Sequence, residues 1–159
     1  MGTRSTALAD RFDAEIEKAV ATLEGLSDAD WRKVTAAEGW TVGVTAHHYA
    51  GALEPISQLI EGLVAGRPGT LDGRTLDAMN AQHARDFADC TKAETIALLR
   101  KGAAVASSTI RGLTEAELGR SGTVLVDLPQ MTVEQLIQAA LFAHLEEHFG
   151  SIRKTLGRG

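Results

Sequence analysis

Two histidines near the end of the chain, His144 and His148, have the spacing of a metal-binding pair. They stand four residues apart in the stretch AHLEEHFGSI, which lies in a segment predicted to be helical. Residues four apart on a helix have Cβ atoms about 5–6 Å apart, a distance from which two imidazoles can converge on one ion. The competing interpretation is that each is a hydrogen-bonded core residue, which is the commoner role of a single inward histidine.

The helical phase of the last segment places both histidines on its apolar face. At 100° per residue they fall within a stripe formed by apolar side chains. That stripe contains Val133, Ile137, Ala140, Leu141 and Ile152. Glu146 points away from the stripe, whereas Glu147 lies about 100° from His148 and is a candidate to flank a site.

His48, in the stretch TAHHYAGALEP, is the expected third member of the group. On the inner face defined by Val44, Ala52, Leu59 and Leu63, His48 lies in the middle, and His47 is rotated by about 100°. Burying three imidazoles without partners costs about 1–3 kcal/mol each, so a shared ion is favoured. Three histidine ligands leave one position open for water or substrate, which is typical of a catalytic metal rather than a structural one.

Other candidate chemistry along the chain is weaker. HLEEH matches H-x-x-E-H, the inverted zinc-protease motif, but such a short pattern often arises by chance and no sheet is predicted to bind a peptide. Leu145 occupies the glutamate position of H-E-x-x-H. His83 lies among polar residues and is predicted to face solvent, and Cys90 has no evident base partner. Trp40 is predicted to be either a core anchor or the wall of a ligand pocket.

Four long helices are predicted to position these histidines. Their approximate ranges are 5–23, 42–64, 91–113 and 132–156, each about 30 Å long, and the first two are separated by a short helical turn and a loop. A shorter helix from Leu76 to about Ala88 follows a glycine-rich loop. The predicted fold class is all-α, a four-helix bundle with one short extra helix in a connection and almost no strand.

Composition narrows the kinds of partner. A chain of 159 residues that is 44% hydrophobic predicts one domain over residues 1–159. The formal net charge of −5, with basic residues spread along the chain, predicts no nucleic-acid and no membrane partner. A single cysteine and the lack of a signal-peptide core predict a cytoplasmic protein, and no apolar stretch reaches the roughly 18 residues of a membrane span.

Several motifs resemble those of the DinB/YfiT-like proteins. EGWTVGVTAHHYAG resembles the entry to their second helix, where a tryptophan is followed eight residues later by a histidine, as Trp40 is by His48. AHLEEHFGSIRKTL resembles their closing H-x-x-x-H helix. LDAMN, which ends at Asn80, resembles a segment in the branch related to the N-terminal domain of mycothiol-dependent maleylpyruvate isomerase. The resemblance covers nearly the whole chain.

The resemblance implies a DinB-type bundle in which His48, His144 and His148 bind a divalent metal, most often zinc or nickel. It also implies a homodimer and a thiol-dependent S-transferase that acts on a small electrophile, with a thiol such as mycothiol activated by the metal. Asn80, Glu147 and Trp40 are the residues we expect around the cofactor. The alternative is a non-catalytic bundle that binds a metal or a small ligand, with the metal in a structural role.

Overall fold

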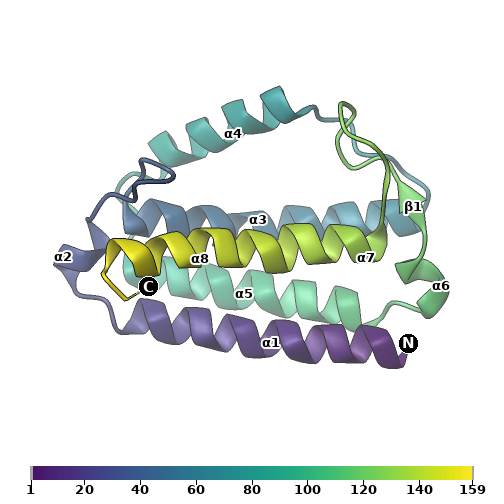
Figure 1. Cartoon of the computed structure of the whole chain (residues 1–159), viewed down its shortest axis with the longest axis horizontal. Helices are drawn as coiled ribbons and strands as arrows, with labels where there is room; N and C mark the ends of the chain where they lie inside the picture. Colours follow the sequence, from purple (N-terminus) through teal and green to yellow (C-terminus); the bar gives the residue numbers. More distant parts are fainter. Residues whose placement is uncertain (1, 159) are drawn as a thin grey trace.

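Four long helices lie side by side in the computed structural model, which describes residues 2–158 (Figure 1). They are α1 (Thr3–Glu24), α3 (Val42–Val64), α5 (Lys92–Arg111) and a last helix in three parts. Those parts are α7 (Val133–Leu136), the π-helical segment η1 (Ile137–Ala143) and α8 (His144–Thr155). The predicted all-α fold class is confirmed.

Short elements connect the long helices. They are α2 (Asp28–Trp31), α4 (Gly73–Asp86), α6 (Glu115–Leu118), β1 (Ser121–Gly122) and β2 (Met131–Thr132). The two strands pair antiparallel, with Ser121 opposite Thr132. Within residues 2–158, every helix is too short or too polar to cross a bilayer.

Local capping explains where the long helices begin. The side chain of Thr41 accepts a hydrogen bond from a backbone N–H three residues on, at the start of α3. Thr91 with Glu94, and Thr132 with Gln135, form reciprocal capping boxes at the starts of α5 and α7. Each box satisfies N–H groups that the first turn of a helix leaves unpaired, so these residues fix the helix starts that their types predict.

The core fills the space between the long helices. α3 packs mainly against α5, α5 packs against α1, and α8 packs on α3. Burying each large apolar side chain stabilises the fold by about 1.5–3 kcal/mol. The largest fully buried side chains are Tyr49, Phe12, Phe149, Leu23, Leu53, Ile60, Leu99, Ile110, Leu118, Ile137, Leu141 and Ile152.

The π-helical segment η1, directly before His144, departs from the regular α-helix predicted for the last segment. A π-helix has more residues per turn than an α-helix, so a phase counted at 100° per residue drifts across η1. The hydroxyl of the buried Tyr49 on α3 donates to the carbonyl of Leu141 inside η1 at 2.7 Å. This hydrogen bond ties the irregular turn to α3, and the four-residue spacing of His144 and His148 within α8 is unaffected.

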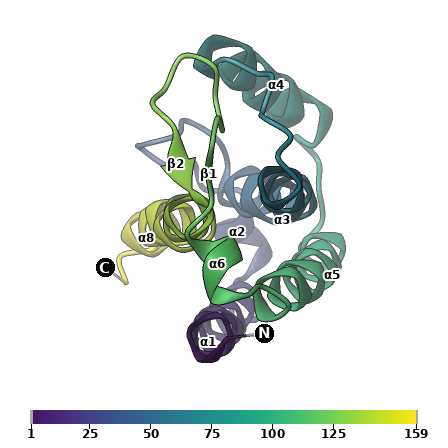
Figure 2. The same cartoon turned by 90° about the vertical axis from the view of Figure 1, so that its right-hand side faces the viewer.

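The helix α4 lies outside the bundle, next to α3 (Figure 2). It begins at Gly73, three residues earlier than predicted, because Oδ1 of Asp72 accepts a hydrogen bond from the backbone N–H of Thr75 at 2.7 Å. None of the fourteen α4 residues, all of which the structure describes, is buried. α4 is therefore attached to the bundle mainly at its ends.

Candidate metal site

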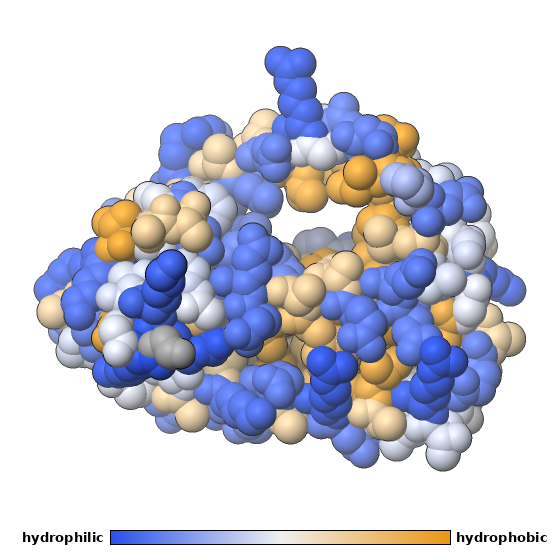
Figure 3. Space-filling model, in the orientation of Figure 1, coloured by the Kyte–Doolittle hydropathy of each residue, from blue (hydrophilic) through white to orange (hydrophobic). Residues whose placement is uncertain are grey.

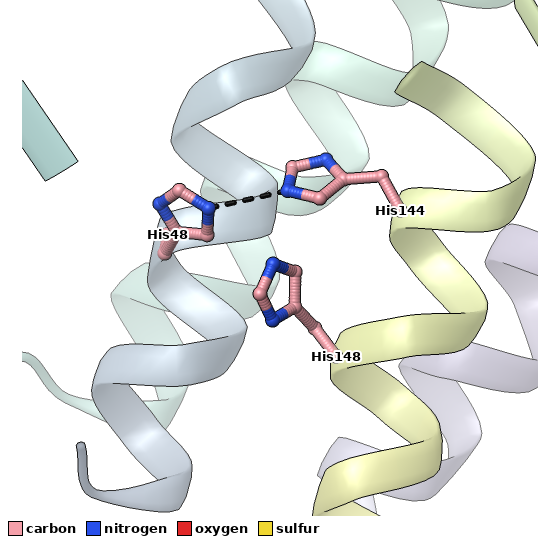
Figure 4. Close-up of side chains that lie close together, drawn as sticks. All are labelled: His48, His144 and His148. Atoms are coloured by element: carbon pink, nitrogen blue, oxygen red, sulfur yellow. Dashed lines mark hydrogen bonds between the residues drawn. The ribbon is translucent and has the colours of Figure 1, made fainter. Parts of the chain in front are cut away.

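His48 on α3 faces His144 and His148 on α8 (Figure 4). Nε2 of His48 and Nε2 of His144 lie 3.2 Å apart. One ring nitrogen from each of the three histidines lies within 4.8 Å of the other two. The structure therefore brings together the three side chains that helical phase placed on inward faces.

The three imidazoles are largely shielded from water. His48 and His148 are 8% and 6% exposed, and His144 is half-buried. The ring of Trp40 lies 5.2 Å from that of His48, and the ring of Tyr49 lies 5.2 Å from that of His144, both measured between centroids. Trp40 thus lies against the three-histidine group, and its role as the wall of a ligand pocket stays a prediction.

A carboxylate that the sequence reasoning did not identify orients His148. Nδ1 of His148 donates to Oε1 of Glu38 at 3.0 Å, and the hydroxyl of Ser151 donates to Oε2 of the same carboxylate at 2.7 Å. Nε2 of His148 is then the nitrogen left to face the other two histidines. A carboxylate behind a histidine is the usual way in which a protein fixes the tautomer of a metal ligand.

The loop before α3 carries Glu38 to this position. Gly39, the next residue, has a φ of 70°, a left-handed conformation that glycine adopts without strain. The backbone N–H of Thr35 donates to the carbonyl of Trp40 at 2.8 Å and closes the turn. Glu38 lies two residues before Trp40, in the loop predicted between the first two long helices, and this position is the only signal for Glu38 that the sequence offers.

Burial and mutual repulsion keep two of the histidines neutral. Burial, together with the neighbouring imidazoles, lowers the pKa of His48 to about 3. Burial and His148 lower the pKa of His144 to about 4, although a hydrogen bond to the carbonyl of Ala140 opposes the shift. A neutral imidazole presents a lone pair, which is the form that binds a metal.

The pKa of the Glu38 carboxyl is lowered, so the group is ionised beside His148. Burial alone raises this pKa, but hydrogen bonds from Ser151, Thr35 and His148 together outweigh burial. The site therefore contains one buried negative charge beside three imidazoles. Such a charge offsets part of the cost of placing a divalent cation away from water.

His47 and His83 form a second pair beside the three-histidine group, where α4 approaches α3. Nδ1 of His47 and Nε2 of His83 lie 2.8 Å apart, and the ring of Phe87 stacks on His47 with centroids 4.2 Å apart. The prediction that His83 faces solvent is wrong, because α4 folds over α3 and leaves His83 half-buried against His47. His47 points away from the three-histidine group, as its rotation of about 100° predicted.

Two of the expected cofactor contacts lie outside the three-histidine group. Asn80 is half-buried on α4, and Glu147 is exposed on α8. Their contact with a cofactor stays a prediction.

The chain folds as an all-α bundle, and three histidines on two of its helices bring their ring nitrogens together. It is therefore a candidate metal-binding helical bundle. Imidazole donors suit zinc, nickel, copper and iron, so this set fits a divalent transition metal. The family model described as the DinB superfamily matches residues 11–152. The chain therefore belongs to the DinB superfamily. Among curated proteins, none matches this chain.

Proposed function

We propose that the protein is a divalent-metal-dependent enzyme in which His48, His144 and His148 bind zinc or nickel. The observation that carries the proposal is the convergence of three imidazole nitrogens within 4.8 Å of one another, supplied by two helices of the bundle. Three protein ligands leave a coordination position for an exogenous group, as in catalytic zinc sites.

The proposed reaction is the transfer of a low-molecular-weight thiol, such as mycothiol, to a small electrophile. A bound divalent cation lowers the pKa of a coordinated thiol, so that the thiolate is available at neutral pH. Glu38 and Ser151 hold His148 in the tautomer that leaves its Nε2 free. Trp40 and Tyr49 limit the access of water to the histidines, which strengthens electrostatic interactions there.

The second candidate is a non-catalytic bundle, as a monomer or homodimer, in which the metal stabilises the fold. The observation that favours it is the deep burial of His48 and His148, because a metal held between α3 and α8 would link two helices of the core and couple metal binding to folding. The half-buried His144 favours the catalytic candidate, since it leaves one side of the group closer to solvent.

Cobalt substitution tests the proposal and separates the two candidates. We expect one equivalent of Co²⁺ to bind, and added mycothiol or another small thiol to produce a sulfur-to-cobalt absorption band. The same protein is then assayed for thiol consumption with a panel of small electrophiles. A control with His144→Ala removes the half-buried ligand and is expected to lose the absorption band.

Two outcomes would contradict the proposed enzyme. Less than about a tenth of an equivalent of transition metal in tag-free protein from supplemented medium would rule out the site. Stoichiometric metal that raises the melting temperature, with no thiol-dependent band and no turnover, would support the structural candidate instead.

A further inference from the structure

An open passage lies between α4 and the bundle (Figure 3). At its far end, the carboxylate of Asp127 accepts a hydrogen bond from the backbone N–H of Gly73 at 3.0 Å, and the N–H of Val126 donates to the carbonyl of Leu71 at 2.9 Å. At its near end, His83 and Phe87 contact His47. α4 thus spans the passage, and contacts within the chain join both ends of α4 to the rest of the protein.

The side of α4 that faces the bundle is apolar. His83 contacts α3, and helical phase places Leu76, Met79 and Phe87 within about 40° of His83. Met79 is 52% exposed and Phe87 is 41% exposed. A helix usually gains its stability by burying such a stripe. Here His47 covers the stripe at His83 and Phe87, and Met79 stays more than half exposed.

The facing wall on α3 is also apolar and leads to the histidine group. His48, Ala52, Pro55 and Leu59 follow one another at steps of four, three and four, and therefore share one face of the helix. A Cβ placed on Gly51, three residues after His48, would lie 3.6 Å from Nε2 of His83, which shows that α4 approaches this side of α3. Ala52 and Leu59 are half-buried and Pro55 is exposed, so the wall is accessible.

The His83 end of the passage adjoins the candidate metal. The ring centroids of His83 and His48 lie 5.9 Å apart. From Leu76 to Phe87 the apolar face of α4 extends about 16 Å at 1.5 Å per residue. A molecule lying along this face would have one end beside His48 and the other near the loop that contains Asp127.

We propose that this passage binds an elongated, uncharged, apolar small molecule whose polar end reaches the three histidines. The chain surrounds the opening (Figure 3) because both ends of α4 are attached, so a small molecule can enter it and a folded protein cannot. The two apolar walls select against charge, since burying an unpaired charge is costly. The inference deepens the proposed function and rests on it for the reaction, because it makes the electrophile a molecule with a long apolar tail. The binding of that tail does not require the metal.

A fluorescence titration of metal-free protein with N-phenylnaphthylamine, a neutral probe that brightens in apolar surroundings, tests the proposal. Met79→Glu places a charge in the passage and is expected to weaken probe binding at least about tenfold. The matched control is Ala81→Glu, on the opposite side of α4 and exposed, which is expected to leave probe affinity unchanged. Decanol is expected to displace the probe at far lower concentration than butanol.

Leu76→Glu serves as a second variant, and circular dichroism checks that each variant folds. Equal probe affinity in wild type and both inner-face variants would overturn the proposal. So would light scattering that shows Met79→Glu converting a dimer to a monomer without a change in probe affinity, because α4 would then be a protein interface. Probe binding in a protein that binds no metal would leave the passage supported and the metal-dependent function rejected.

Discussion

Two histidine clusters lie next to each other on α3, and adjacent residues supply one member to each, with the rings of His48 and His83 5.9 Å apart between centroids. His48 joins His144 and His148, where three nitrogens converge and Glu38 orients one ring. His47 joins only His83, and their two nitrogens share one hydrogen bond at 2.8 Å. Both clusters consist of histidines shielded from water, so residue type and burial are not sufficient to define a metal site. The number of converging lone pairs and the group behind each ring distinguish the two clusters.

Removing a histidine from each cluster should give the largest contrast. His48→Ala is expected to weaken metal binding by at least about 100-fold, since it removes a direct ligand and loss of an outer-shell partner alone costs 10–100-fold. His47→Ala, one residue away, is expected to change metal affinity less than about threefold, because its ring points to α4. Competition with a chromogenic chelator measures both affinities. Equal losses in the two variants would contradict the assignment of the clusters.

The pH dependence of stability should separate the clusters next. The pKa values of His48 and His144 in the folded protein, about 3 and about 4, lie below the usual value of about 6.5. Below pH 6.5 the unfolded chain therefore binds protons that the folded chain does not, and the free energy of unfolding falls as pH falls. By pH 5.5 the expected loss is on the order of 2–3 kcal/mol for the two histidines together.

Urea denaturation of metal-free protein at pH 7.5 and 5.5 measures this loss. The double variant His48→Gln, His144→Gln is expected to lose most of the difference between the two pH values. Burial also lowers the pKa of His47 and of His83, so the matched double variant His47→Gln, His83→Gln is expected to lose a smaller part of the difference and to keep the greater part of it. A wild-type protein equally stable at both pH values would show that the first cluster is not held neutral.

The carboxylate behind His148 provides a third test. Glu38→Ala removes the acceptor that fixes the tautomer of His148, and it is expected to weaken metal binding by about 10–100-fold. Glu146→Ala, which removes an exposed carboxylate paired with Arg153 on the same helix as His148, is the control and should have little effect. Isothermal titration calorimetry with Zn²⁺ measures both. Unchanged affinity in Glu38→Ala would mean that Glu38 only stabilises the loop.

The contrast between the clusters also shows which features local sequence determines. The capping residues predict the bounds of α3, and helical phase predicts that His48, His144 and His148 point inward. Both depend only on residues a few positions apart in the sequence. Glu38 contacts a residue 110 positions away and reaches it through a left-handed glycine, so no periodicity signals it. The π-helical turn before His144 and the burial of His83 likewise depend on contacts with α3.

The smallest expected effect concerns the second cluster and α4. His83→Ala removes the hydrogen bond to His47, and it is expected to lower the free energy of unfolding by less than about 1.5 kcal/mol, the usual net value of one hydrogen bond. None of the described α4 residues is buried, so α4 can open without global unfolding. We therefore expect the backbone amides of residues 73–86 to exchange faster in His83→Ala than in the wild type. Hydrogen exchange measured by mass spectrometry tests this, with the exposed Asp77→Ala as the control on the same helix. Unchanged exchange in α4 would show that the His47–His83 contact does not hold α4 to the bundle, whereas faster exchange with unaltered metal affinity would assign the two histidine clusters separate roles.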